Sequence, residues 1–387
     1  MLIPSQKMNH LGTESAFSVL AKAAKLSNEG KDIINLGIGQ PDFKTPAHIC
    51  ESAIKAITDG NHGYTPANGI LPLREAVCCD LEMRRGANIN PDNVLIVPGG
   101  KVTMFFAIQI FGEPGTEIIY PDPGFPIYAS AINYSGAKAV PLPLLEKNGF
   151  SFSADDLLAL ITDKTRLIII NSPANPTGGV TPKVEMDKLA KGLEAFPNVA
   201  IMSDEIYSRM LYDTAQHASM LAYPNLKDRV IILDGWSKTY AMTGWRLGYS
   251  VWPESLIEHA TKLAINSHSC VNAPTQFAGI AALEGPQDAV DEMMAAFSKR
   301  RTVIVDALNN LPGFSCIMPG GAFYAFSNIT QTGMTSMELQ ELLLNEAGVA
   351  TIAGTSFGQY GEGYVRFSYA NSTENILKAL DRVKSIL

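Results

Sequence analysis

The stretch Leu167-Ile-Ile-Ile-Asn-Ser-Pro-Ala-Asn-Pro-Thr-Gly178 joins an unbroken apolar run to a polar turn sequence. An apolar run without polar alternation is typical of a strand buried on both faces, as in a parallel sheet. The prolines and the glycine that follow predict that the strand ends at once. In open parallel sheets, ligands bind at the carboxyl ends of the strands. This stretch therefore predicts an α/β protein with a site at one edge of its sheet.

The same arrangement recurs through the middle of the chain. Short apolar runs alternate with helical patterns, which favours a mostly parallel sheet covered by helices on both faces. The other strand candidates are residues 94–97, 117–120, 199–202, 230–233 and 247–251.

A polar motif follows five of these six strand candidates. Because the carboxyl ends of parallel strands meet at one edge of a sheet, we expect the five loops to form one site. The motifs are Pro-Gly-Gly-Lys at 98–101, Pro-Asp-Pro-Gly-Phe at 121–125, Asn-Ser-Pro-Ala-Asn-Pro-Thr-Gly at 171–178, Ser-Asp-Glu-Ile-Tyr at 203–207 and Asp-Gly-Trp-Ser-Lys at 234–238.

The chain changes character after about residue 285. A long helical pattern at 290–311 precedes strand candidates at 322–326 and 364–369 and a last helix at 373–387. Near the other end, residues 14–28 predict an amphipathic helix with Thr13 as N-cap and Gly30 just beyond its end. We expect a large domain of residues 46–285 and a smaller α+β domain of residues 1–45 and 286–387.

Composition excludes several classes of protein. The chain has 387 residues, of which 46% are hydrophobic, and a net charge of −8, which argues against nucleic acid or an anionic membrane as partner. Its five cysteines show no metal-binding spacing, so no metal is expected. The N-terminus lacks the apolar region of a signal peptide, and the apolar runs are too short to span a bilayer. We expect a cytoplasmic protein.

The segment 235–249 contains the most reactive combination of side chains. Lys238 lies between the hydroxyls of Ser237 and Thr239, and Arg246 follows in a turn rich in Gly and Trp. An amine beside groups that bind phosphate suits a Schiff base with a phosphorylated aldehyde. A surface loop could also carry a Lys and an Arg, but the five loops that share an edge favour a site.

With these motifs, the chain resembles fold-type I, class I pyridoxal-phosphate-dependent aminotransferases of the bacterial aspartate-aminotransferase-like branch. The resemblance extends from Leu-Gly-Ile-Gly-Gln-Pro-Asp-Phe at 36–43 to Val-Arg-Phe-Ser-Tyr at 365–369. It implies a homodimeric enzyme with shared active sites that moves the α-amino group of an L-amino acid to a 2-oxo acid by a ping-pong mechanism. The implied cofactor is pyridoxal 5′-phosphate.

The resemblance assigns three catalytic residues, Lys238, Asp204 and Tyr207. Lys238 matches the lysine that forms the aldimine with the cofactor and then shuttles a proton. Asp204 matches the carboxylate that pairs with the pyridine nitrogen, and Glu205 is a neighbouring rival. Tyr207 and Asn175 match the hydrogen-bond partners of the phenolate oxygen, although the sequence around Asn175 is also a good turn.

The resemblance also assigns the phosphate contacts. These are Gly100 and Lys101 through backbone N–H groups at a helix start, Ser237 through its hydroxyl and Arg246 through its guanidinium. Tyr64 matches a tyrosine that reaches the phosphate of the neighbouring subunit.

Further positions match residues that contact the cofactor ring or the substrate. Phe125 corresponds to the aromatic residue over the pyridine ring. Arg366 matches the arginine that takes the α-carboxylate, near Gly39 and Asn175. In aspartate-specific relatives, the lysine at the position of Lys101 helps to recognise the side-chain carboxylate.

The side-chain specificity departs from the aspartate pattern. The threonine that assists such a lysine is replaced by Ala16, next to Phe17 and near Glu14, and Gln40 replaces a common glutamate. We therefore expect either an aspartate- or glutamate-related donor or a broad range with aromatic and aliphatic donors. The acceptor is 2-oxoglutarate, oxaloacetate or pyruvate, and the sequence does not choose among them.

Two other classes share these motifs. A Cβ–S lyase, or another enzyme that forms an α-carbanion on this fold, would carry the same Lys238 and Asp204. A regulatory module that binds pyridoxal phosphate is a weaker alternative, since such modules carry an added DNA-binding domain and this chain is acidic.

Overall fold

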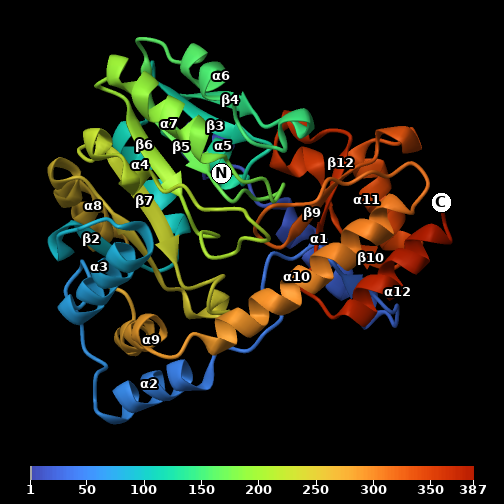
Figure 1. The fold of residues 1–387 in the computed structure, drawn as a ribbon, viewed down its shortest axis with the longest axis horizontal. Helices are drawn as coiled ribbons and strands as arrows, with labels where there is room; N and C mark the ends of the chain where they lie inside the picture. The colour runs from blue at the N-terminus through green and yellow to red at the C-terminus, as the bar shows by residue number, and fades with distance from the viewer. Residues whose placement is uncertain (1) are drawn as a thin grey trace.

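A computed structural model describes residues 2–387, which form two units, each with its own β-sheet (Figure 1). In the larger sheet all neighbouring strands are parallel, except that β8 runs antiparallel to β2 and β7. The predicted mostly parallel sheet is therefore confirmed. Its seven strands are, in spatial order, β2 (Val94–Val97), β8 (Gly248–Val251), β7 (Val230–Gly235), β6 (Ala200–Asp204), β5 (Thr165–Asn171), β3 (Glu117–Asp122) and β4 (Lys138–Pro143).

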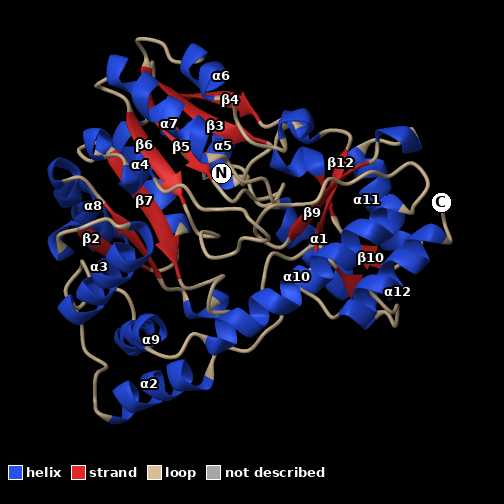
Figure 2. Cartoon of the chain, viewed as in Figure 1, coloured by secondary structure: helices blue, strands red, loops and turns tan. Residues whose placement is uncertain are grey.

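Successive side chains of a strand point to opposite faces of a sheet. Because most of these strands contain unbroken apolar runs, both faces of the sheet are apolar. In β2, Val94 and Ile96 pack into one core cluster, and Leu95 and Val97 pack into another. Figure 2 shows the strands lying between helices. The first cluster includes α3 (Leu71–Arg85), α6 (Ala154–Ala159), α7 (Lys183–Gly192) and α9 (Ala273–Glu284), with α2 (Ala47–Thr58) against α9; the second includes α4 (Lys101–Phe111), α5 (Ile127–Ser135) and α8 (Glu254–Ser267).

The second unit combines the C-terminal part of the chain with the N-terminal segment. Its antiparallel sheet has the order β11 (Ile352–Ala353), β12 (Tyr364–Ser368), β9 (Tyr324–Asn328). The long helix α10 (Asp288–Asn309) leads into it from the larger unit (Figure 1). From the N-terminal segment, β1 (Ile34–Asn35) pairs in parallel with β10 (Val349–Ala350). The remaining helices are α1 (Ser15–Asn28), α11 (Ser336–Asn345) and α12 (Thr373–Lys384).

Several local features differ from the sequence prediction, and two of them have a direct physical reason. Strand β4 at the edge of the large sheet was not predicted, because Pro141 and Pro143 interrupt its apolar pattern. The prediction of Thr13 as N-cap is wrong: the helix begins at Ser15, and the N-cap Glu14 makes no side-chain cap bond. Gly30 does lie beyond the end of α1, with φ +91°, which favours glycine.

Among residues 2–387, no helix is long and apolar enough to cross a membrane. Within that range there is also no group of three or more His, Cys, Asp or Glu side chains placed to hold a metal ion. The cysteines of these residues are all free thiols.

Candidate active site

The carboxyl ends of the parallel strands open into a cavity of about 520 Å³ that residues of both units line. Each of the five polar loops contributes at least one lining residue, so the fold brings them together as the strand order requires. All residues proposed for the site except Tyr64 line this cavity, namely Gly39, Gly100, Lys101, Phe125, Asn175, Asp204, Tyr207, Ser237, Lys238, Arg246 and Arg366.

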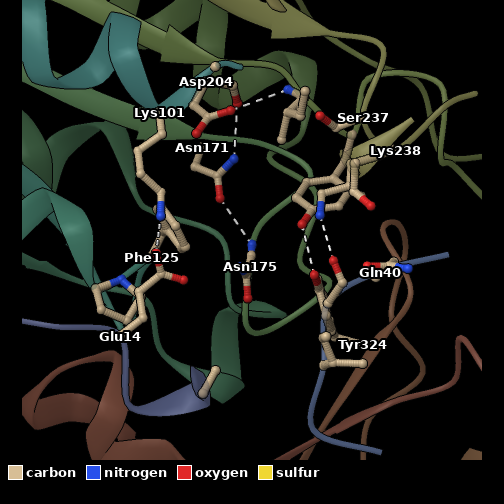
Figure 3. A pocket seen from close by; sticks show the side chains of 18 of the residues that line it. Glu14, Gln40, Lys101, Phe125, Asn171, Asn175, Asp204, Ser237, Lys238 and Tyr324 are labelled. Carbon is tan, nitrogen blue, oxygen red and sulfur yellow. Dashed lines mark hydrogen bonds and ion pairs between the residues drawn. The ribbon is translucent and has the colours of Figure 1, made fainter. Parts of the chain in front are cut away.

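Lys238 places a reactive amine on the wall of the cavity. It follows β7, and its Nζ donates a hydrogen bond of 2.5 Å to the carbonyl of Gly39 (Figure 3). Burial lowers the pKa of Lys238 to about 8, and the charges of Arg366 and Arg246 act in the same direction. At pH 7 about a tenth of this amine is therefore uncharged and nucleophilic, far more than in an exposed lysine.

Asp204 supplies a carboxyl group to the same cavity. It ends β6, is almost fully buried, and accepts hydrogen bonds from the Tyr128 hydroxyl at 2.6 Å and the Ile206 N–H at 3.3 Å. Burial raises the pKa of Asp204 to about 6, although these two hydrogen bonds lower it. At neutral pH and above, the carboxyl is therefore mostly ionised. The role of Tyr128, which comes from α5, had no signal in the sequence.

The neighbouring acid, Glu205, faces a different environment. It does not line the cavity but pairs with Arg85 at 2.6 Å and His217 at 2.8 Å. Although burial opposes the change, Arg85 and His217 lower the pKa of Glu205 to about 2. Of the two acids that the motif offered, Asp204 is the one that faces the cavity.

One end of the cavity is suited to an anion. The first turn of α4 leaves backbone N–H groups unpaired and carries the positive end of the helix dipole. Ser237 and Arg246 line the cavity with Gly100 at this end. Gly99, at φ +92°, lies against the arginine, and a Cβ there would come within 2.1 Å of Arg246 Nη2. Glycine is therefore required for this approach.

Arg366 places a buried guanidinium opposite the strand ends. It lies on β12, and its Nη1 donates to Asn175 Oδ1 at 2.8 Å while Nη2 donates to the carbonyl of Gly37. Its guanidinium carbon lies 4.5 Å from the ring centroid of Tyr324 and 4.7 Å from that of Phe357. Within residues 2–387, its hydrogen-bond partners are the Asn175 amide and the Gly37 carbonyl rather than a carboxylate, and its Nε has no partner. Burial lowers its pKa. A carboxylate ligand would compensate this charge.

Two tyrosines connect the units at the cavity. The hydroxyls of Tyr207 and Tyr324 lie 2.8 Å apart. A Cβ at Gly39 would come within 2.3 Å of the Tyr324 hydroxyl, so a glycine is needed where that segment passes. Tyr324 was not singled out in the sequence, where it appeared only as one apolar position of a strand.

Tyr64 is placed differently from the other predicted residues. It lies in the loop between α2 and α3, the residue is 94% exposed, and it does not line the cavity of its own chain. Any contact of Tyr64 with such a cavity needs a second copy of the chain.

Comparison with known proteins agrees with this geometry. Residues 31–383 match the sequence profile of the family described as "Aminotransferase class I and II". The chain belongs to this family. It is an aminotransferase with the expected α/β fold, and the resemblance seen in the sequence is confirmed.

Relatives of this aminotransferase carry more than one substrate name. An aspartate aminotransferase of Pyrococcus horikoshii is 42% identical over 92% of this chain and 91% of that protein. An aromatic-amino-acid aminotransferase of Thermococcus litoralis is 38% identical over 96% of this chain and 95% of that protein. The solved structure of a Thermus thermophilus aspartate aminotransferase with maleate, 32% identical, superimposes over the full length of both chains with a TM-score of 0.95.

Proposed function

We propose that this aminotransferase uses pyridoxal 5′-phosphate to move the α-amino group of an L-amino acid to a 2-oxo acid by a ping-pong mechanism. The observation that carries the proposal is the placement of the Lys238 amine, the Asp204 carboxyl and the Arg366 guanidinium on one cavity. When bound, pyridoxal phosphate supplies an aldehyde that joins to amines and a ring that takes up electron density.

The residues present fit this cofactor from end to end. The N–H groups of Gly100 and Lys101, with Ser237 and Arg246, would hold the phosphate. The Asp204 carboxylate would hold the ring nitrogen in its protonated form. Asn175 and Tyr207 would donate hydrogen bonds to the phenolate oxygen at the edge of the ring, and Phe125 would stack on its face.

The other groups act on the substrate. Arg366 would bind the α-carboxylate through two parallel hydrogen bonds, with Asn175 and the backbone of Gly39 beside it. This grip orients Cα for loss of its proton. Lys238 Nζ, when it is not bonded to the cofactor, would take up the proton that leaves Cα. Its lowered pKa favours the uncharged amine that this step needs.

We further propose a homodimer in which Tyr64 of each chain reaches the phosphate end of the other chain's cavity. The exposure of Tyr64 supports this arrangement, since a large side chain with no cover in its own chain is available to a partner. The proposed domain limits are residues 46–285 for the large domain and 1–45 with 286–387 for the small one, and the proposed location is the cytoplasm.

A panel of amino donors against 2-oxo acid acceptors tests the function. We expect stoichiometric formation of a new amino acid and a new 2-oxo acid. Release of ammonia or a thiol without an acceptor would instead indicate a Cβ–S lyase, and cofactor binding without turnover would indicate a regulatory module. Borohydride reduction of the cofactor-loaded protein followed by peptide mapping should place the label on Lys238, and a label elsewhere would contradict the assignment.

A further inference from the structure

An ion pair crosses the mouth of the cavity. Glu14, directly before α1, pairs with Lys101, the first residue of α4, and both side chains line the cavity (Figure 3). The pair joins the N-terminal segment to the large unit across 87 positions of sequence. The Glu14 side chain is 13% exposed, so this carboxylate is largely withdrawn from water.

The charge of Lys101 is already compensated in this arrangement. Besides Glu14, its ammonium lies over two aromatic rings, 5.9 Å from the centroid of Phe17 and 5.5 Å from that of Phe125. A cation that has a carboxylate and two ring faces as partners has little attraction left for a further anion.

The surroundings of the ion pair are mostly apolar. Phe17 is 60% exposed and lines the mouth, where an incoming apolar side chain can cover it. The other apolar residues that line the cavity near α1, α4 and the small sheet are Ala16, Leu20, Ile38, Met104, Pro126, Ile352 and Phe357.

From these contacts we propose that Glu14 determines specificity by masking Lys101, so that the site favours uncharged apolar side chains over dicarboxylic substrates. The inference rests on the proposed transamination at this cavity. A substrate side-chain carboxylate approaching Lys101 would meet Glu14 as well, and two carboxylates around one ammonium repel each other. Glu14 is also close enough to act on Arg366, where burial lowers the pKa and the Glu14 charge opposes that change.

Binding of unreactive probes to the cofactor-loaded enzyme tests this inference without turnover. Calorimetric titration should show that wild type binds 3-phenylpropanoate more tightly than maleate. In Glu14→Gln, which keeps the size of the side chain and removes its charge, maleate should bind about tenfold more tightly relative to 3-phenylpropanoate. The matched control is Glu341→Gln, because Glu341 pairs with Lys22 of α1 but does not line the cavity, and this ratio should not change there.

Kinetic selectivity gives a second readout. The ratio of kcat/KM for phenylalanine to that for aspartate should fall about tenfold in Glu14→Gln. Adding Lys101→Met should remove this gain for aspartate, since the unmasked ammonium is its cause. An unchanged probe ratio and an unchanged kinetic ratio in Glu14→Gln would overturn the inference. Failure of wild type to transfer any amino group would instead overturn the proposed function, while the probe ratio would still report on Glu14.

Discussion

The cavity has two walls that differ in origin and in predictability. The strand-end wall follows parallel strands of the large sheet, and the outer wall comes from the N-terminal segment and the second unit. The strand-end wall includes Gly100, Asn175, Asp204, Ser237 and Lys238, and the outer wall includes Glu14, Phe17, Tyr324, Phe357 and Arg366.

The two walls divide the proposed work. The strand-end wall carries the groups that would hold the cofactor, fixed by a sheet whose strands are buried on both faces. The outer wall carries the groups that would meet the substrate, on segments that reach the cavity from distant parts of the chain. A common cofactor site can thus be combined with different substrate preferences, because the outer wall can vary while the sheet stays the same.

The largest expected effect is on the strand-end wall. Lys238→Ala should lower kcat/KM for amino-group transfer by at least about 10⁴-fold, because one amine both holds the cofactor and moves the proton. Steady-state assays of purified variants measure this loss. Lys188→Ala, which removes an exposed lysine of α7, should keep full activity. If Lys238→Ala kept more than a hundredth of the activity, the chemistry would not depend on this wall as proposed.

The next effect belongs to the outer wall. Arg366→Ala should lower kcat/KM for all amino acids by about 10²–10³-fold, because it removes a buried cation that fixes the α-carboxylate. The absorbance of the bound cofactor should persist. Arg382→Ala, at a partly exposed arginine that pairs with Asp32 and does not line the cavity, should be close to wild type. Loss of cofactor from Arg366→Ala would mean that Arg366 binds the cofactor and not the substrate. The two walls would then not differ in their roles as proposed.

The strand-end wall was predictable because each of its motifs is contiguous with the strand that positions it. An apolar run such as 167–170 and the loop after it form one local pattern, and the strand direction brings such loops together. The motif with Asp204 and Glu205 left two candidates, since the burial that separates them depends on Arg85 and His217, which lie elsewhere in the chain.

The pairings within the outer wall were not predictable from one sequence, although the resemblance had singled out Arg366. Glu14 and Lys101 are 87 positions apart, and Tyr207 and Tyr324 are 117 apart. Neither pairing follows from periodicity or from a turn signal, because each depends on how the two units pack. Within the large unit, separation along the chain also hid Tyr128, a helix residue 76 positions from the Asp204 carboxyl that it contacts.

The buried Asp204 carboxyl gives the strand-end wall a stability cost that depends on pH. The pKa of Asp204 is raised from 3.8 to about 6 in the folded protein. Below about pH 3.8 the carboxyl is neutral in both states, and as pH rises through about 6 the folded protein must ionise a buried group. The contribution that the neutral carboxyl makes to the free energy of unfolding is then lost. In the cofactor-free protein, the stability of Asp204→Asn relative to wild type should therefore increase as pH rises from 4 to 6.5. The total increase should be about 2–3 kcal/mol at most.

Urea unfolding of the cofactor-free protein at a series of pH values measures this difference. Asp163→Asn, at an exposed aspartate that does not line the cavity, is the matched control for removal of one carboxyl. If the gain of Asp204→Asn were the same at pH 4 and pH 7, the carboxyl would not titrate with a raised pKa, and the strand-end wall would carry no electrostatic cost.

The smallest expected effect comes from removing the hydrogen bond that Tyr128 donates to the Asp204 carboxyl. Tyr128→Phe removes the hydroxyl that donates to Asp204 at 2.6 Å and keeps the buried ring. Since this hydrogen bond favours the ionised carboxyl, its loss should raise the pKa of Asp204 by about one unit and weaken cofactor binding about five- to tenfold. The pH below which cofactor affinity falls should move upward by the same unit in fluorescence titrations. Tyr134→Phe on the same helix is the matched control and should leave that pH unchanged. A loss of affinity in Tyr128→Phe that is equal at all pH values would mean that the ring position matters and the hydroxyl does not, so the strand-end wall would be tuned by packing alone.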